Sequence, residues 1–233
     1  MKQSFLIFLY LIAILPFTGC SEDEDGNDDN VAIENPMVLL EPTIPSAMSS
    51  SSDPYAQAAN AMVISATSFA SIGASFFTDI ENASPATSSL PGGIGTCSYY
   101  EYSAGGSTVA YQACEDETKY YLDVYYQQST TLDQVLALEQ KKDGSSGTME
   151  LTSGVSYVVS WSVSNDELTM SIEYNNVLVY KLVSDQNTGS GSVVYYDETD
   201  TGAKQVFEWD ASGAGTYTSY DSSGSIVDTA SWS

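Results

Sequence analysis

Residues 156–174 have the sequence SYVVSWSVSNDELTMSIEY, in which apolar and polar side chains alternate on both sides of Asn165-Asp166. Alternation with a period of two predicts strands with one buried face and one wet face. Asn and Asp tolerate the backbone conformation of a two-residue hairpin turn, which pairs Trp161 with Met170 on the apolar face. The other face carries Ser156, Ser160, Ser162, Thr169, Ser171 and Glu173. This stretch therefore predicts an antiparallel hairpin with one side in water.

Similar patterns extend over most of the chain. Across residues 96–232, runs rich in Tyr, Val, Ile and Thr alternate with short clusters of Gly, Asn, Asp and Ser. The expected fold class is mainly β, an antiparallel β-meander that forms a curved sheet or an open barrel. After a turn at 175–176, residues 177–183 are apolar on both faces apart from Lys181, and Leu178, Tyr180 and Leu182 are expected on the side that should be wet.

An earlier hairpin brings two cysteines together. With a two-residue turn at Gly105-Gly106, Cys97 lies opposite Cys114 at a non-hydrogen-bonded position, where Cα atoms approach to about 4.5 Å. That distance is within disulfide range. Because an exported chain meets an oxidising compartment, we predict a Cys97–Cys114 disulfide that stabilises the fold by about 3 kcal/mol.

The last third of the chain contains an internal repeat. Gly189-Ser190-Gly191, Tyr196-Asp197, Gly202 and Trp209 return as Gly213-Ala214-Gly215, Tyr220-Asp221, Gly224 and Trp232, after 22 to 24 residues. This spacing resembles that of MORN repeats, small β-hairpins that stack into an extended sheet, over about residues 185–232. The resemblance implies a structural or interaction role and brings no catalytic residues.

One long amphipathic helix is expected before the strands. Asp53 is a suitable N-cap, and Pro54 is a suitable first helical residue. Apolar or small side chains then recur at alternating intervals of four and three residues: Tyr55, Ala59, Met62, Ala66, Phe69, Gly73, Phe76 and Ile80. We expect the folded domain to occupy residues 53–233, with this helix covering the sheet.

The N-terminus resembles that of a bacterial lipoprotein. Residues 5–15 form an apolar run that is too short to span a bilayer comfortably. Small residues then lead to Cys20, as in the lipobox at which lipoprotein signal peptidase cuts, although Phe17 stands where Leu is usual. The resemblance implies a signal peptide over residues 1–19 and lipidation of Cys20, with acyl chains that anchor the mature chain to a membrane.

An acidic run, SEDEDGNDD, follows Cys20 over residues 21–29. It resembles the signal that exports some lipoproteins of Gram-negative bacteria to the cell surface side of the outer membrane; the periplasmic face is the alternative. The run also alternates acidic residues as a calcium loop does, but it lacks the required glycine, so a solvated tether is preferred. With the Pro- and Ser-rich stretch behind it, it predicts a disordered tether over residues 20–52.

The charge balance limits the function classes. The chain has 31 acidic residues, six lysines and no histidine, for a net charge of -25. Nucleic acid is excluded as a partner because phosphate binding needs clustered basic residues. Catalytic Ser-His or Cys-His pairs are impossible, and no nucleotide-binding fingerprint occurs. We therefore expect no cofactor, no metal site and no enzymatic activity.

Tyrosines give the best indication of binding. In residues 120–126, Tyr121, Asp123 and Tyr125 share the face opposite the expected core, and Tyr99 lies beside them on a neighbouring strand. Aromatic faces with a carboxylate between them suit a sugar or an extended peptide. The expected function is a surface-exposed binding or structural module with a glycan or protein partner.

Two alternative functions stay open. A β-structure around a helix resembles the LolA and LolB type of lipid and lipoprotein carrier, which implies a dry cavity. Outward carboxylates at Glu101, Asp123 and Glu173 could instead act in glycan hydrolysis, which needs a pair of carboxylates at a defined separation.

Overall fold

The computed structural model describes residues 41–80, 84–85, 94–104, 107–127, 131–152, 154–197, 199 and 202–233. Two helices are followed by strands only. Their bounds are α2 (Ser46–Ser49), α3 (Pro54–Ile80), β1 (Ser84–Pro85), β2 (Thr96–Ala104), β3 (Ser107–Glu115), β4 (Lys119–Gln127), β5 (Leu132–Lys141), β6 (Ser146–Thr152), β7 (Ser156–Ser164), β8 (Glu167–Tyr174), β9 (Val177–Asp185), β10 (Gly191–Tyr196), β11 (Lys204–Trp209), β12 (Gly215–Tyr220) and β13 (Ile226–Trp232).

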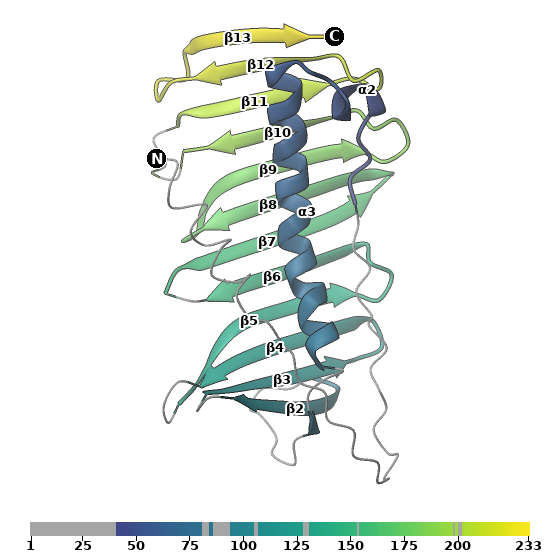
Figure 1. Ribbon diagram of the computed structural model, residues 1–233, viewed down its shortest axis with the longest axis vertical. Helices are drawn as coiled ribbons and strands as arrows, with labels where there is room; N and C mark the ends of the chain where they lie inside the picture. Colours follow the sequence, from purple (N-terminus) through teal and green to yellow (C-terminus); the bar gives the residue numbers. More distant parts are fainter. Residues whose placement is uncertain are drawn as a thin grey trace. The chain divides into compact units, whose positions relative to one another are not determined.

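The strands form one antiparallel sheet in which each strand pairs with the next along the chain (Figure 1). The prediction of a mainly β antiparallel meander is confirmed. Among the described strands, β1 and β13 stand at opposite ends of the order, so the sheet does not close on itself. Hairpin connections of this kind need no crossover segment over either face of the sheet.

The turn residues act as their sequence predicts. Asn165 and Asp166 have φ values of 52° and 64°, and Asn175 and Asn176 have values of 49° and 66°. Positive φ at both central residues is the geometry of the hairpin turn whose twist matches that of the strands. The predicted register of β7 and β8 is confirmed, with Trp161 opposite Met170.

A β-bulge corrects the expectation for β9. Ile172 pairs with Tyr180 and Glu173 pairs with Leu178, so Val179 is an extra residue in β9. An extra residue reverses which side chains face which side of the sheet. Tyr180 and Leu182 are therefore buried, and only Leu178 keeps its predicted side. A short-range pattern cannot show where such a bulge falls.

Helix α3 lies across one face of the sheet, which we call the helix face; the opposite face is the far face (Figure 1). Asp53 caps the helix, since its Oδ1 accepts hydrogen bonds from the backbone N–H groups of Tyr55 and Ala56. The ring of Tyr55 stacks on Tyr217 of β12, with 4.9 Å between centroids. The hydroxyl of Tyr180 donates a hydrogen bond to the carbonyl of Met62.

The buried side of α3 is turned slightly from the predicted one. Of the expected residues, Ala59 and Ala66 are buried, while Met62 is half-buried. Ala56 and Val63 complete the buried set. These small side chains let the first half of α3 pack directly against β10, β12 and β13. Within the described residues, no helix is both long and apolar enough to cross a membrane.

The folded part begins earlier than predicted. Residues 41–52 were expected in a disordered tether, but Met48 is only 1% exposed and joins the core. The hydroxyl of Ser184 donates to the carbonyl of Thr43, and the hydroxyl of Thr43 donates to the carbonyl of Gln186. A Cβ on Gly213 would lie 2.8 Å from the backbone nitrogen of Met48. This segment is therefore packed on the sheet; the predicted tether residues 20–40 lie outside the described residues.

The predicted disulfide is present. Cys97 and Cys114 are direct partners in the β2–β3 ladder, and their sulfur atoms are bonded with 4.1 Å between the Cα atoms. The hairpin register around Gly105-Gly106 is therefore confirmed by the pairs that flank it, although the two glycines themselves lie outside the described residues.

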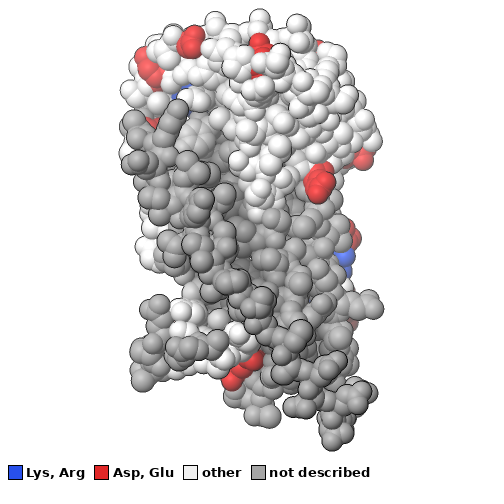
Figure 2. Space-filling view, in the orientation of Figure 1, with Lys and Arg blue, Asp and Glu red and all other residues white. Residues whose placement is uncertain are grey.

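The helix face differs in chemistry from the far face. The described part of α3 up to Ser68 contains no charged residue, and Figure 2 shows mostly uncharged surface over this part of the face, with acidic side chains toward its margins. Polar and aromatic side chains that could bind a ligand gather instead on the far face, where the strands alternate.

Candidate ligand-binding face

Strand register arranges far-face side chains in rows that cross the sheet. One row runs through Tyr99, Gln112, Asp123, Ala137, Glu150, Val158 and Glu173. The next row runs through Cys97, Cys114, Tyr121, Glu139, Thr148, Ser160 and Ser171. Directly paired residues of an antiparallel sheet point to the same side, with about 4.8 Å between strands. Residues far apart in the sequence thus share one surface.

Three of the four platform residues predicted from the sequence line one hollow. Tyr121, Asp123 and Tyr125 of β4 border a space of about 550 Å³ that continues over β5, β6 and β7. Other polar side chains around it are Gln134, Glu139, Thr148 and Glu150. We call this space the tyrosine hollow. Its volume lies in the range of small-molecule sites.

Asp123 is half-buried at the centre of the tyrosine hollow. Burial raises the pKa of its carboxyl group above the ordinary value, while a hydrogen bond from Nε2 of Gln134 to Oδ1, at 2.7 Å, acts in the opposite direction. Burial also raises the pKa of the neighbouring Tyr125, with smaller contributions from the charges of Asp123 and Tyr99. Each of these groups is partly withdrawn from water before any ligand arrives.

Tyr121 is held in place from the side. Its hydroxyl donates a hydrogen bond of 2.9 Å to Oδ2 of Asp116 in the turn before β4. Hydrogen bonds to its carboxylate lower the pKa of Asp116 to about 2. The largest effect comes from the backbone N–H of Thr118, followed by the hydroxyl of Tyr121 and the backbone N–H of Lys119. The pKa of Tyr121 is raised by the same hydrogen bond. A ring that is fixed in this way loses little rotational freedom when a ligand packs on it.

Tyr99, the fourth platform residue, lies on the same face but is not part of the hollow's border. It occupies the row of Asp123, with Gln112 of β3 between them. Gln112 is fully buried, and among the described residues its Oε1 has no hydrogen-bond partner. Its Nε2 lies 3.5 Å from the sulfur of Cys114. The disulfide therefore holds the strands directly beside the platform.

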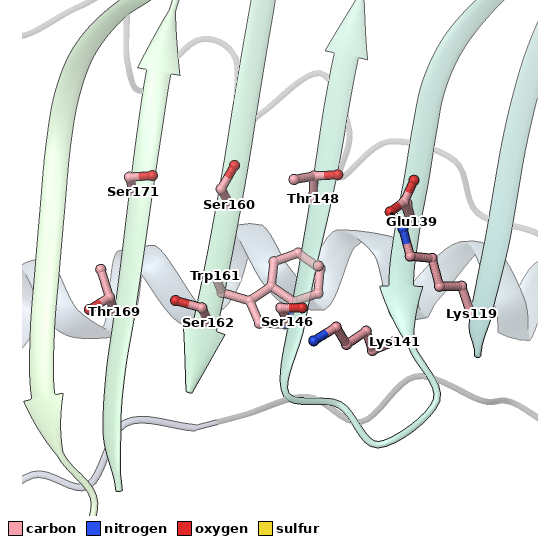
Figure 3. A pocket seen from close by; sticks show the side chains of 11 residues that line it. Lys119, Glu139, Lys141, Ser146, Thr148, Ser160, Trp161, Ser162, Thr169 and Ser171 are labelled. Atoms are coloured by element: carbon pink, nitrogen blue, oxygen red, sulfur yellow. Dashed lines mark hydrogen bonds and ion pairs between the residues drawn. The ribbon is translucent and has the colours of Figure 1, made fainter. Parts of the chain in front are cut away.

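A second hollow continues from the first across β6, β7 and β8. It has a volume of about 300 Å³ and shares Glu139 and Thr148 with the tyrosine hollow. Six hydroxyl groups line it, from Ser146, Thr148, Ser160, Ser162, Thr169 and Ser171. Figure 3 shows them projecting from adjacent strands, with the helix behind the sheet. We call it the hydroxyl hollow.

Lysines stand at one end of the hydroxyl hollow. Lys119 and Lys141 are direct partners in the β4–β5 ladder, and both border the space. Lys119 forms an ion pair with Glu139. Among the described residues none forms an ion pair with Lys141, whose charge contributes to lowering the pKa of Asp143 in the following turn. Lys142 is engaged elsewhere, with Glu115 at 2.8 Å.

The outward carboxylates are not all brought together. Glu101 lies in the row of Ala110 and Tyr125, and Glu173 lies beyond Val158. Neither borders the tyrosine hollow, whereas Glu150 does. Sequence reasoning missed Glu150, Gln134 and Lys141 because it assigned no register to β5 and β6. The alternation of Ser and Thr in β7 and β8 was the available signal for the hydroxyl hollow.

The remaining expectations fall outside this face. Cys20, the predicted lipidation site, lies outside the described residues. Among the described residues, no group of three metal-binding side chains occurs. Comparison with protein-family models, with curated proteins and with solved structures finds no match. The far face must therefore be interpreted from its own chemistry.

Proposed function

We propose that this chain is a lipid-anchored binding module of the bacterial outer membrane that displays its β domain at the cell surface and binds a glycan along the far face. The observation that carries the binding proposal is the tyrosine hollow, in which two tyrosine rings flank the half-buried carboxylate of Asp123. Sugars combine apolar C–H faces with hydroxyl groups, so aromatic rings beside hydrogen-bonding groups complement them.

The adjoining hydroxyl hollow supports an extended ligand. The two spaces share Glu139 and Thr148, so a chain of several sugar units can pass from one to the other. Carboxylates accept hydrogen bonds, and Ser and Thr hydroxyls donate or accept them. A surface that offers both is suited to polyhydroxylated ligands. A protein segment is the alternative partner for the same face.

Glycan binding can be tested with substitutions of Tyr125 in the full chain, purified in detergent. Tyr125→Ala removes the ring and is expected to weaken binding of the best ligand on a glycan panel about tenfold, whereas Tyr125→Phe keeps the ring and most of the affinity. Tyr220→Ala is a matched control, since Tyr220 lies in β12, away from the hollow. Binding that is unchanged in Tyr125→Ala, or absent for every glycan, would contradict the proposal.

The anchor has its own test. We expect Cys20→Ser to abolish incorporation of labelled fatty acid and to release the protein from membranes. On intact cells, a membrane-impermeant reagent should label the wild-type protein. Labelling that requires permeabilised cells would place the protein on the periplasmic face and remove the display part of the proposal.

Glycan hydrolysis is a second candidate, favoured by one observation. Asp123 and Glu150 border the same hollow and are separated only by Ala137 in their row. Two strand spacings place their Cα atoms roughly 10 Å apart, and side chains that lean toward each other from this distance would reach the carboxylate separation of inverting glycosidases, about 6.5–9.5 Å. Asp123, whose pKa burial raises, would be the acid. Release of reducing ends that stops in both Asp123→Asn and Glu150→Gln supports this candidate; binding without release excludes it.

A further inference from the structure

The lysines of this acidic chain differ in whether they pair with acidic residues. Three of the six lie at one end of the β4–β5 hairpin, at positions 119, 141 and 142. Lys119 neutralises Glu139, and Lys142 pairs with Glu115 and lies 5.0 Å from the centroid of the Tyr120 ring. Of these three lysines, Lys141 is the one that makes no ion pair within the described part of the chain, and its side chain is exposed.

The surroundings of Lys141 lack a balancing acid on the ligand side. The charged groups that border the hydroxyl hollow are Lys119, Glu139 and Lys141, so the hollow carries a net positive charge of one. Asp143, whose pKa is lowered in part by the charge of Lys141, belongs to the turn after β5 and does not border the hollow. A positive site surrounded by hydroxyl donors complements an anion.

We infer that the glycan proposed above carries an anionic substituent, a carboxylate or a sulfate, which binds in the hydroxyl hollow against Lys141 while a sugar ring several units further along the same glycan packs on Tyr125, six residues along β4 from the Lys119 that pairs with Lys141. This inference rests on the proposed function and specifies its ligand class. Ser146 and Ser162 are the nearest hydroxyl donors by register, since Gln140 pairs with Gly147 and Ser146 pairs with Ser162. Figure 3 shows the side chain of Lys141 beside Ser146, with Ser162 on the next strand.

The overall charge of -25 does not oppose this arrangement at short range. At physiological ionic strength, exposed charges more than about 8 Å apart are largely screened. A single charge-assisted hydrogen bond therefore contributes locally, while the acidic background selects against long, densely charged polyanions such as nucleic acids. The ligand class that fits is a glycan with spaced acidic groups.

Matched pairs of probes test the inference on the full chain, purified in detergent. A hyaluronan hexasaccharide, with a carboxylate on every second sugar, and its methyl ester share one backbone and differ in charge; monosulfated maltohexaose and maltohexaose do the same for sulfate. We expect at least one acidic probe to bind about tenfold more tightly than its neutral partner. Lys141→Gln should remove this difference, whereas Lys204→Gln, in β11 and beside Tyr220, should preserve it.

The outcomes separate the inference from the proposed function. Equal binding of the acidic and neutral probes, with dependence on Tyr125 retained, overturns the inference and leaves glycan binding standing. An acidic preference that survives Lys141→Gln also overturns it. Failure of every probe, charged or neutral, overturns the proposed function together with the inference. A preference for the hyaluronan hexasaccharide alone identifies a carboxylate ligand, and a preference for monosulfated maltohexaose alone identifies a sulfate.

Discussion

At the scale of single residues, all three tryptophans of the chain lie over glycines of the neighbouring strand. The pairs are Gly147 with Trp161, Gly191 with Trp209 and Gly215 with Trp232. The indole N–H groups of Trp209 and Trp232 donate hydrogen bonds of 2.7 Å to the carbonyls of Gly189 and Gly213. The repeated G-x-G motif thus has two roles: one glycine makes room for the ring, and the other accepts its hydrogen bond.

Gly215→Ala tests this role. A Cβ at Gly215 would meet both the Trp232 ring and the carbonyl oxygen of Glu208 at less than van der Waals distance, and the backbone cannot yield without disturbing the ladder. We expect the free energy of unfolding to fall by about 1–3 kcal/mol in chemical denaturation. Thr216→Ala, at an exposed neighbouring position, should change it by less than about 0.5 kcal/mol. Equal stability of the two variants would contradict the steric explanation.

The charged carboxylate of Asp123 is expected to lower the free energy of unfolding at pH 7, as residues kept for binding often do. Because burial raises the pKa of its carboxyl group in the folded state, its contribution to stability is present below the unfolded pKa and is lost as pH rises through the folded value. Asp123→Asn keeps the acceptor for Gln134 but removes the charge. At pH 7 it should raise the melting temperature while weakening ligand binding. A lower melting temperature would mean that the charge is a structural requirement.

At the scale of elements, the turns share a second repeated feature, an aspartate whose carboxylate binds the backbone of the turn. The carboxylates of Asp185, Asp210 and Asp221 each accept hydrogen bonds from backbone N–H groups two to four residues ahead. Side-chain hydrogen bonds from Ser212 and Ser223 are the largest cause of the lowered pKa of Asp210 and Asp221, and the backbone N–H of Thr188 is the largest for Asp185. These aspartates close hairpins as Asx turns.

The aspartates of the turns predict that the folded state loses stability at low pH. Folded carboxyl groups with lowered pKa values contribute stability above their unfolded pKa of about 4 and lose that contribution as pH falls toward about 2, the value for Asp116. We expect the denaturant midpoint to decrease over this range. An Asp210→Asn, Asp221→Asn double variant should be less stable at pH 7 and show a shallower decrease. A decrease as steep as that of the wild type would assign the acid sensitivity to other groups.

At the scale of the whole folded unit, a segment from before the helix joins sheet residues far along the chain. Met48 is buried beside Gly213, and Thr43 exchanges hydrogen bonds with β9 and the turn after it. Gly189 and Gly213, whose carbonyls hold the tryptophans, also provide the space against which this segment packs. The segment therefore closes the core over the C-terminal hairpins.

Met48→Ala distinguishes a packed segment from a tether. Removing a fully buried Met side chain should lower the free energy of unfolding by about 2–5 kcal/mol. Ser49→Ala, at an exposed position in the same turn, is the control and should have little effect. If both variants are as stable as the wild type, residues 41–52 do not belong to the core in solution.

The sequence by itself determined the antiparallel class, the hairpin registers at Asn165-Asp166 and Cys97–Cys114, and the aromatic side of β4. Alternation and turn chemistry act between neighbours in the chain, so they can be interpreted locally. Only the tertiary structure decided where β-bulges reverse the strand faces. The bulge at Val135 brings Gln134 to Asp123, and the bulge at Val179 buries Tyr180. The tertiary structure also decided that the tyrosine and hydroxyl hollows adjoin. Their relative position depends on the register of every strand pair from β4 to β8, and each of these registers is fixed by packing across the sheet.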